Sequence, residues 1–215
     1  MMKLWHCVGA RSFRPLWMLA EMGLNFDLEI LPFPPRWLKP DYLEVNPLGT
    51  IPYFTDGDVA LTESTAICQY LGEVHGPTPL IVGSHEPDFG RYLNLMFQSD
   101  ATFTFPQTLV LRYTRLEPPE KRQPRVAADY AKWFLARMTA VERQLADGRD
   151  HLVGGRFTAA DIAVGYAVML AETLELAGDL APATRAWWAR LKARDGFRAA
   201  QAREAVPPGL AASGG

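Results

Sequence analysis

Residues Asn46 to Ile67 read Asn-Pro-Leu-Gly-Thr-Ile-Pro-Tyr-Phe-Thr-Asp-Gly-Asp-Val-Ala-Leu-Thr-Glu-Ser-Thr-Ala-Ile, and the rest of the chain is organised around this stretch. Its first four residues indicate a turn, because Asn-Pro and Gly are frequent turn formers. Residues 51–54 are apolar and prone to form a strand, and Asp56-Gly57 predicts a hairpin before a returning strand at 59–61. A polar run that begins at Thr62 then opens a helix.

Four residues of this stretch suggest a binding site. Pro52 lacks the N–H that a central strand needs, and a cis Ile51-Pro52 bond would turn the Ile51 backbone outward, where it can pair with an extended peptide. Ser64, at the start of the helix, offers free amides to an anion, and Glu63 beside it offers a carboxylate to an amine. An amine and a carboxylate on one small molecule describe the head of an α-amino acid.

The residues before this stretch predict a β-α-β unit. We expect a strand at 3–8, a helix at 13–22 and a second strand at 25–31, with Ser12 where a helix N-cap belongs. A β-α-β connection is right-handed and gives a parallel pair of strands. Together with the hairpin and its helix, the order is βαβ-ββα, which is that of a thioredoxin-like domain.

The second part of the chain predicts helices only. From residue 86 onward apolar residues recur every three or four positions. Pro106 should kink or break the first helical segment, and Thr158 and Asp161 form a capping signal before an apolar run. The helical segments expected in this part, besides the capped one, are 87–113, 125–146, 182–193 and 196–204.

We therefore predict an α/β plus all-α fold of two domains joined by a Gly/Pro-rich linker. The expected divisions are a thioredoxin-like domain at 1–78, an all-helical domain at 86–206 and a flexible tail at 207–215.

Two motifs carry a resemblance to a known family. Asn-Pro-x-Gly-x-Ile-Pro followed by Leu-Thr-Glu-Ser-x-Ala-Ile resembles the glutathione-binding half of the cytosolic glutathione S-transferases, of the serine type found in bacteria. Gly-Gly-Arg-Phe-Thr-Ala-Ala-Asp-Ile-Ala, about ninety residues later, resembles the signature of their C-terminal domain, in which a capped core helix begins. Two motifs in this order are more specific than either alone.

The resemblance implies a detoxification transferase that conjugates the thiolate of reduced glutathione to an electrophilic, largely apolar small molecule. Glutathione is then a co-substrate, and no permanently bound cofactor is implied. Two alternatives remain: a glutathione-dependent isomerase or peroxidase on the same fold, and a non-catalytic glutathione-binding regulatory protein. A disulfide reductase is disfavoured, because residues 9–15 contain no cysteine.

The catalytic residue implied by the resemblance lies in the turn after the first strand, where the family uses Tyr, Ser or Cys. Ser12 is the best match in this chain, although its hydroxyl would equally serve as a helix cap. Arg11 and Arg14 flank it and are alternatives, since either can stabilise negative charge. His6 is a further alternative, on the strand where related proteins often carry Tyr.

The resemblance also implies the residues that bind glutathione. Glu63 and Ser64 would hold the γ-glutamyl head, and Ile51-Pro52 would pair with the peptide backbone. Trp37 and Lys39 match the loop that binds the glycine end, with Arg36 equally possible by position. Asp100 would reach the ligand bound in the partner subunit.

An electrophile pocket and a dimer interface are implied for the helical domain. The expected walls of the pocket are aromatic: Phe13, Phe103, Phe105 and Tyr113. Taken one by one, the last three fit a core or interface position better than a pocket, and only together do they match the electrophile-binding wall of the family. Segment 87–113 carries more aromatic residues than one helix face needs. We therefore expect a twofold homodimer that sets this segment against the first domain of the partner.

Composition argues against several other classes of protein. The net charge of −2 over 215 residues argues against nucleic acid or an anionic membrane as the main partner. No apolar run of ~18 residues suggests a membrane span, and the first residues lack the apolar core of a signal peptide. Two cysteines and four scattered histidines give no metal-ligand spacing. We expect a cytoplasmic protein without a metal.

Overall fold

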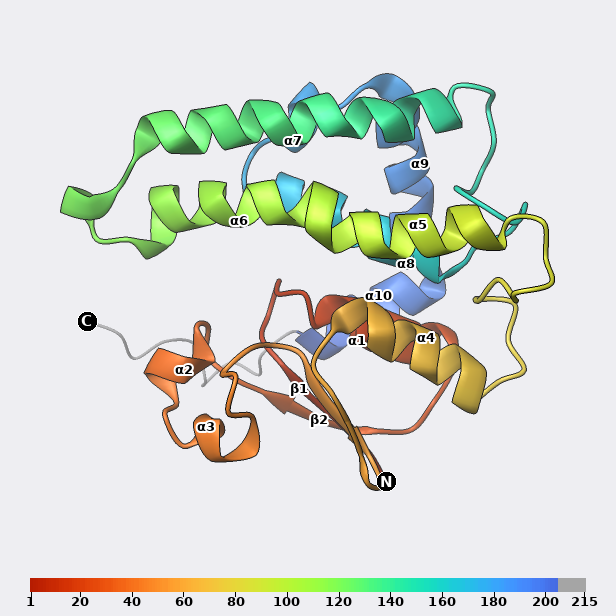
Figure 1. The fold of residues 1–215 in the computed structure, drawn as a ribbon, viewed down its shortest axis with the longest axis horizontal. Coiled ribbons are helices and arrows are strands. Elements are labelled where there is room, and N and C mark those ends of the chain that lie inside the picture. The colour runs from red at the N-terminus through yellow and green to blue at the C-terminus, as the bar shows by residue number, and fades with distance from the viewer. Residues whose placement is uncertain (205–215) are drawn as a thin grey trace. The chain divides into compact units, whose positions relative to one another are not determined.

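The computed structural model describes residues 1–204, and the chain divides into two compact units (Figure 1). The first unit contains residues 1–75 together with the described residues from 192 onward, and the second contains residues 76–191. The tail expected at 207–215 lies outside the described residues.

The first unit contains a four-stranded sheet of mixed direction in the order β2-β1-β3-β4. β1 and β2 are parallel, as the β-α-β prediction requires, and β3 runs antiparallel to both β1 and β4. The βαβ-ββα order of a thioredoxin-like domain is thereby confirmed. The strands are β1 (Met2–His6), β2 (Asp27–Ile30), β3 (Tyr53–Asp56) and β4 (Val59–Leu61).

The segment before β3 departs from regular strand. The Ile51-Pro52 bond is cis, as predicted, and β3 begins only at Tyr53 rather than at residue 51. Pro52 has no N–H to give to the ladder, which explains the later start. At the other end of β3, Asp56 pairs with Val59 across a two-residue turn in which Gly57 has a φ of 57°.

Within residues 1–204, five helices belong to the first unit, and Figure 1 shows α1, α4 and α10 gathered along one side of the strands. α10 comes from the end of the described chain, and its Phe197 meets the rings of Phe13 and Trp17 edge-on at 5.4 and 4.9 Å. The expected division at 86–206 placed α10 in the helical domain, whereas it packs on α1. The helices are α1 (Phe13–Glu21), α2 (Pro35–Leu38), α3 (Tyr42–Val45), α4 (Ser64–Val74) and α10 (Asp195–Glu204).

The docking of α10 is fixed by a polar contact as well. Arg194 donates from Nε and Nη2 to the two carboxylate oxygens of Glu21, both at 2.8 Å, and Trp17 Nε1 donates to the same carboxylate at 2.9 Å. Gly196 allows the close approach, because a Cβ there would collide with the Glu21 carboxyl group. The position and tilt of α10 on α1 are thus defined at its first turn.

β1 presents different side chains to its two faces, as alternation along a strand requires. Trp5 and Cys7 belong to a buried cluster with Leu31 and Tyr42. Leu4 and His6 alternate with them and are also fully buried.

The second unit is entirely helical within the described residues. Figure 1 shows α5 and α6 following one another end to end, with α7 running back alongside. α8 is buried nearly all round, which marks it as the centre of this unit. None of the described helices is long and apolar enough to cross a membrane. The helices are α5 (Phe89–Gln98), α6 (Phe105–Leu111), α7 (Pro124–Leu145), α8 (Ala159–Thr173) and α9 (Pro182–Lys192).

Short irregular segments connect these helices. π-helical stretches cover Ser99–Thr104 and Arg112–Leu116, and 3₁₀ turns cover Pro119–Lys121 and Ala177–Asp179. The first π-helical stretch lies directly before Pro106, which falls in the opening turn of α6. The chain nevertheless stays helical from Phe89 to Leu116, so the helix does not break at Pro106; the ladder changes to π-helical spacing just before the proline, which has no N–H to give to the preceding turn.

The capping signal at the start of α8 is also confirmed. Asp161 Oδ2 accepts the backbone N–H of Thr158 at 2.9 Å, as a capping box requires. The other oxygen accepts Leu152 N at 3.0 Å and Trp187 Nε1 at 3.1 Å. One buried carboxylate thus joins the loop before α8, the start of α8, and α9.

Candidate functional site

Three segments of the first unit come together at one end of its sheet. They are the turn between β1 and α1, the segment before β3, and the N-terminus of α4. Ala10 of the first segment and Ile51 of the second pack against the same buried cluster around Trp5 and Cys7. Arg14, in the first turn of α1, reaches Ser64 at the start of α4. The structure thus gathers most of the binding residues expected from the sequence.

The N-terminus of α4 has the form of an anion site. Glu63 precedes the helix with extended backbone (φ −92°, ψ 119°) and is exposed, while Ser64 is only 3% exposed. No side chain caps this end of the helix. The first amides of a helix lack partners within it and attract negative charge. An exposed carboxylate beside such amides can receive an amine and a carboxylate side by side.

Arg14 lies behind this site. Its guanidinium is fully buried, and Nη1 donates to Ser64 Oγ at 2.9 Å. The Ser64 hydroxyl accepts this bond, so its own proton can be donated to another acceptor. Sequence reasoning considered Arg14 only as an alternative catalytic group. The sequence did hold a signal for such a role, since Arg14 is a charged residue within the apolar run Phe13 to Ala20. A charge buried in such a helix requires a polar partner.

Ser12 takes a different role from the cap that was expected. Its Oγ accepts Cys7 N at 3.2 Å and donates to Cys7 O at 3.4 Å, and the residue is fully buried. Ser12 already has helical backbone (φ −63°, ψ −12°), and its side chain caps no amide. Ser12 does hold the N-cap position, where its carbonyl accepts Leu16 N at 3.2 Å, but its hydroxyl faces back to the end of β1 and makes no capping bond. The catalytic role of Ser12 stays a prediction.

Neither cysteine is a ready nucleophile. Burial raises the pKa of the Cys7 thiol to about 12, and its Sγ donates to Pro32 O at 3.5 Å. Burial likewise raises the pKa of the Cys68 thiol to about 12. Since the thiolate is the reactive form, both side chains serve the packing of this unit.

His6 is buried beside an acid that the sequence did not single out. Its Nε2 lies 3.0 Å from Oε1 of Glu204, at the end of α10, and the same oxygen accepts Gly9 N at 2.8 Å. Neither ring nitrogen makes a hydrogen bond of good geometry within the described residues. A glutamate at the end of the last expected helix gave no signal of this role, because 195 residues separate it from Gly9.

The turn before Ile51 is fixed by its own side chains. Asn46 Nδ2 and the Tyr42 hydroxyl both donate to Thr50 O, at 2.9 and 2.8 Å, and Asn46 Oδ1 accepts Leu48 N at 3.2 Å. Asn46 is itself buried. The backbone of Ile51 is therefore held from the residues directly before it.

The loop proposed for the glycine end lies against this turn. Gly49 has a φ of 60°, and a Cβ there would be 2.9 Å from Arg36 Cβ, so α2 rests on the turn. Trp37 is 63% exposed, with the Arg36 guanidinium 4.9 Å from the centre of its ring. Lys39 Nζ lies 3.6 Å from Glu29 Oε1. The choice among Arg36, Trp37 and Lys39 stays open.

The residues expected to line the electrophile pocket differ in exposure. Phe13 is fully buried between α1 and α10, and Phe103 is buried in the second unit, so both hold core positions rather than open surface. Phe105 is exposed, and Tyr113 is partly exposed. Asp100 is partly exposed in the π-helical stretch before α6.

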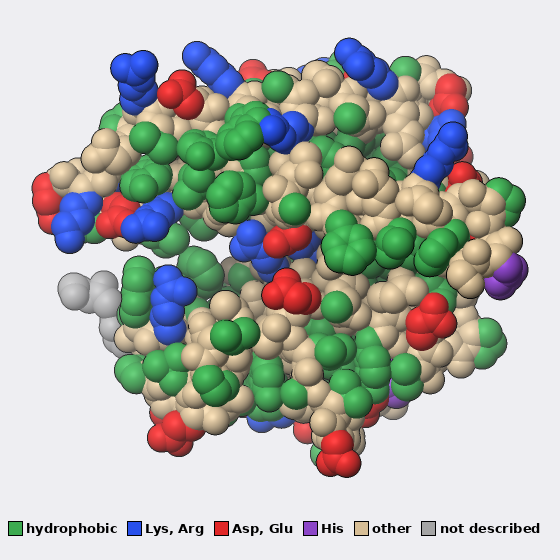
Figure 2. Space-filling view, in the orientation of Figure 1, with side chains coloured by type: hydrophobic (Ala, Val, Ile, Leu, Met, Phe, Trp, Pro, Cys, Tyr) green, Lys and Arg blue, Asp and Glu red, His purple; other side chains and the backbone are tan. Residues whose placement is uncertain are grey.

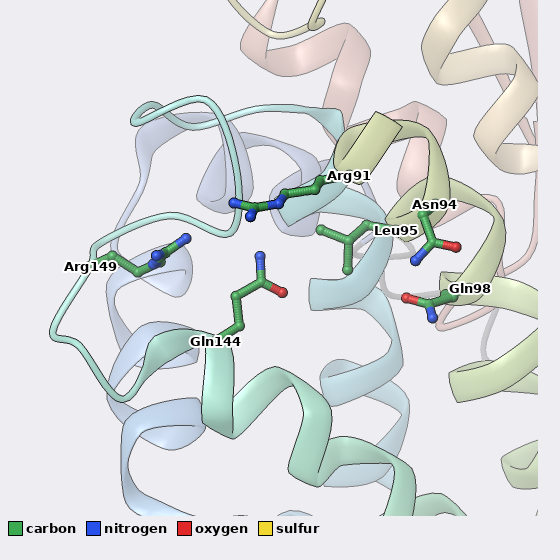
Figure 3. Close-up of a pocket in the computed structure, with 6 residues that line it drawn as sticks. All are labelled: Arg91, Asn94, Leu95, Gln98, Gln144 and Arg149. Carbon is green, nitrogen blue, oxygen red and sulfur yellow. The ribbon is translucent and has the colours of Figure 1, made fainter. Parts of the chain in front are cut away.

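A cavity of about 320 Å³ lies in the second unit (Figure 3). In Figure 3 the side chains of Arg91, Gln144 and Arg149 point toward one another across it. Arg149 is held by Asp147, which accepts its Nε at 3.0 Å. A cavity with two guanidinium groups does not suit an apolar electrophile, and none of the residues expected from the sequence lines it. No group of three metal-binding side chains occurs within residues 1–204.

These observations define a class: a thioredoxin-like domain with a cis-proline before β3 and an open helix N-terminus after β4, followed by an all-helical domain. Models of two domains of one family match the chain in this order. The glutathione S-transferase N-terminal domain matches residues 10–74, and the glutathione S-transferase C-terminal domain matches residues 126–209. The chain belongs to the glutathione S-transferase family, as its motifs indicated.

Individual relatives agree in sequence and in structure. Glutathione S-transferase 3 of Zea mays is 28% identical over 202 residues, covering 89% of this chain and 88% of the relative. A glutathione transferase structure from Methylococcus capsulatus strain Bath has a TM-score of 0.80 and 26% identity, covering 95% and 98% of the two chains. A sphingomonad glutathione S-transferase, solved in complex with glutathione, has a TM-score of 0.81 and 25% identity, covering 95% and 100%.

Proposed function

We propose that this protein is a glutathione transferase that joins the thiolate of reduced glutathione to an electrophilic, largely apolar small molecule. One observation carries the proposal: the exposed Glu63 and the Arg14-supported Ser64 stand together at the open N-terminus of α4. This pair matches the amine and carboxylate of a γ-glutamyl head. Family membership and the glutathione complex of the sphingomonad relative support it.

In this proposal glutathione lies extended across the first unit. Glu63 receives the amine, while Ser64 donates from its hydroxyl and backbone amide to the carboxylate. The backbone beside the cis Ile51-Pro52 bond pairs with the cysteinyl residue of the ligand. Arg36, Trp37 or Lys39 binds the glycine end, and Asp100 of a partner subunit reaches the γ-glutamyl head.

The reaction begins with ionisation of the thiol at the start of α1. A free thiol has a pKa of ~8.5, so a group that stabilises the thiolate raises its concentration at neutral pH. The helix N-terminus, the Ser12 hydroxyl and the charge of Arg11 are the candidate stabilisers. The thiolate then forms a carbon–sulfur bond with the electrophile, which gives up its leaving group or takes the electron pair and is protonated. Arg14 is buried behind Ser64, so we assign it to binding.

Glu63→Ala and Glu63→Gln, measured by calorimetry with glutathione, test the binding site. Charge-assisted contacts contribute roughly 1.5–3 kcal/mol, so affinity should fall about ten- to a hundredfold in both variants. Glu73→Ala is the matched control, because Glu73 lies near the far end of the same helix and bonds Gln69. Unchanged affinity in the Glu63 variants would rule out the site.

The reaction products distinguish conjugation from the alternative activities. A panel of aryl halides, enones, organic peroxides and isomerisable substrates, each with glutathione, distinguishes conjugation from peroxide reduction and isomerisation. Binding of glutathione without turnover of any of them would favour a regulatory protein. Thiol–disulfide chemistry by the protein is disfavoured because both of its thiols are buried.

We also propose a cytoplasmic homodimer. Leu93 and Phe97 stand one turn apart on α5 and are exposed, Phe97 by 68%, and Figure 2 shows hydrophobic side chains along this helix. Phe105, the first residue of α6, is exposed as well. The interface was expected from five aromatic residues of this segment, Phe89, Tyr92, Phe97, Phe103 and Phe105. Two of them, Tyr92 and Phe103, are instead buried within the second unit.

Light scattering tests the dimer. The wild type should show twice the chain mass of 24.0 kDa at micromolar concentration, and Phe97→Glu should approach the single mass. Trp133→Ala, which changes an exposed aromatic side chain on α7, is the control and should stay dimeric. A monomeric wild type would contradict the proposal.

A further inference from the structure

The end of α10 touches the turn on which the proposed chemistry depends. Glu204 Oε1 accepts the N–H of Gly9 at 2.8 Å, and it lies 3.0 Å from Nε2 of His6. Its side chain is 12% exposed, although glutamate is among the residues most often found in solvent. This carboxylate is therefore not an ordinary surface charge, because it is largely buried and faces a backbone donor and an imidazole.

Two other amides of the turn segment are held within the segment itself. Ala10 N donates to Cys7 O at 3.0 Å, and Phe13 N donates to Ala10 O at 2.9 Å. Gly9 has a φ of 69°, the left-handed conformation that glycine adopts without strain, and its amide points to Glu204. The contact with Glu204 therefore holds a residue of left-handed backbone within the turn between β1 and Ser12.

α10, which carries this carboxylate, is held against α1 at its N-terminal end. Arg194, directly before its first residue, is bound to Glu21 of α1, and Phe197, in its first turn, packs against Phe13 and Trp17. Glu204 follows Phe197 by seven residues, or two helical turns, and so lies on the same face. A shift of the turn away from α10 would leave a buried carboxylate and the buried His6 ring without their neighbours.

We propose that Glu204 is a positioning residue for the thiol end of the glutathione site. It holds Gly9, and through Gly9 it sets the place of the Ser12 hydroxyl and of the first amides of α1. The inference rests on the proposed function for its effect on turnover. The contact itself is testable without glutathione. Because the effect depends on a hydrogen bond to Gly9, an acceptor at the right distance matters more than its charge.

Two substitutions separate distance from charge. Glu204→Gln keeps an oxygen at the same reach and removes the charge, whereas Glu204→Asp keeps the charge and withdraws the oxygens by one methylene. The proposal expects kcat with glutathione and a reactive electrophile to fall roughly tenfold in Glu204→Asp and less than about threefold in Glu204→Gln. KM for glutathione should change by less than about twofold in both, because the γ-glutamyl head binds at α4.

Amide hydrogen exchange at Gly9, followed by NMR on the ligand-free protein, measures the contact directly. Gly9 should be protected in the wild type and in Glu204→Gln and lose protection in Glu204→Asp. Arg203→Ala is the matched control: Arg203 lies beside Glu204 on α10, and its guanidinium contacts the ring of Phe26, so the variant loosens α10 without touching the turn. It should leave kcat and Gly9 protection unchanged.

The outcomes are distinct. Equal losses in Glu204→Gln and Glu204→Asp, or a loss of the same size in Arg203→Ala, would overturn the proposal and assign Glu204 to general stability. Unchanged Gly9 protection in Glu204→Asp would overturn it as well. If the wild type does not bind glutathione, the proposed function fails, while the exchange pattern still decides whether Glu204 fixes the turn.

Discussion

Arg14 and Ser64, fifty residues apart in sequence, are joined by a buried hydrogen bond of 2.9 Å from Nη1 to Oγ. The bond links the first turn of α1 to the first residue of α4. It also places a positive charge behind the helix N-terminus at which we propose the γ-glutamyl carboxylate binds. The same guanidinium therefore joins the two helices and favours an anion between them.

This relationship predicts coupling between the two side chains in glutathione binding. Arg14→Met removes the charge at similar length, and affinity should fall by about tenfold or more, since hydrogen bonds to charged groups contribute ~1.5–3 kcal/mol. Ser64→Ala should weaken binding as well, and the double variant should lose less than the sum of the two. Calorimetry on the four proteins gives the coupling free energy. Strictly additive losses would show that Arg14 does not act through Ser64.

The two cysteines should be unreactive in the folded protein. Burial raises the pKa of both thiols, Cys7 and Cys68, to about 12, so almost no thiolate exists at pH 8. A colorimetric disulfide reagent should titrate neither thiol in the native state and two per chain in denaturant. Rapid reaction of one native thiol would show that the turn after β1 or the core of α4 opens readily, and would return disulfide chemistry to consideration.

Asp161 should contribute more to stability than an ordinary helix cap. Asp161→Ala leaves buried donors of Leu152, Thr158 and Trp187 without an acceptor, at ~1–3 kcal/mol each when no water replaces it. Thr158→Ala should cost about 1 kcal/mol. Denaturant unfolding measures both, with Thr158→Ser as the control that keeps the hydroxyl. A smaller loss for Asp161→Ala than for Thr158→Ala would contradict the structure.

Local patterns allowed much of the fold to be predicted. The helix expected at 125–146 is Pro124–Leu145, because its apolar residues recur strictly with the helical period. The cis bond at Pro52 followed from the conflict between a proline and a strand. The capping box at Thr158 and Asp161 followed from a spacing of three residues. Each of these features is decided by neighbours in sequence.

What escaped prediction depends on contacts between distant segments. The packing of Phe197 on Phe13 pairs residues from the two ends of the chain, and periodicity only shows that each is apolar. The direction of the Ser12 hydroxyl depends on how β1 ends, which its helix-start pattern does not reveal. Likewise, the charge of Arg14 was visible in an apolar helix, but its partner on α4 was not.

Glu86 should make stability depend on pH in the acid range. The Arg156 guanidinium and the Gly83 N–H hold the pKa of this carboxyl at about 2 in the folded protein, below its value of ~4.3 in an unfolded chain. Because the folded pKa is lowered, the stabilisation is complete above pH ~4.5 and is lost as the pH falls toward 2. Arg156 also donates to Pro79 O and Ile81 O, so the carboxylate orders the start of the second unit.

The comparison of Glu86→Gln with wild type checks this pH dependence. The difference in unfolding free energy should be present at pH 7 and should shrink steadily below pH 4.5. Glu120→Gln, at an exposed acid of the same unit, serves as the control and should show little difference at any pH. A constant difference between pH 7 and pH 3 would mean that packing of the side chain, rather than its charge, stabilises the unit.

The last prediction concerns the hydroxyl of Ser12. It accepts Cys7 N at 3.2 Å, and its own proton makes only a long bond of 3.4 Å to Cys7 O; because the residue is fully buried, we expect the hydroxyl to turn away from β1 when it donates to a thiolate. Ser12→Ala should therefore raise the pKa of bound glutathione in an ultraviolet difference titration and lower kcat/KM at pH 7 about ten- to a hundredfold, with affinity little changed. Arg11→Ala tests the neighbouring charge in the same assay. If wild type and Ser12→Ala titrate alike, the hydroxyl only pins the turn to β1, and an effect of Arg11→Ala would assign the thiolate to that guanidinium.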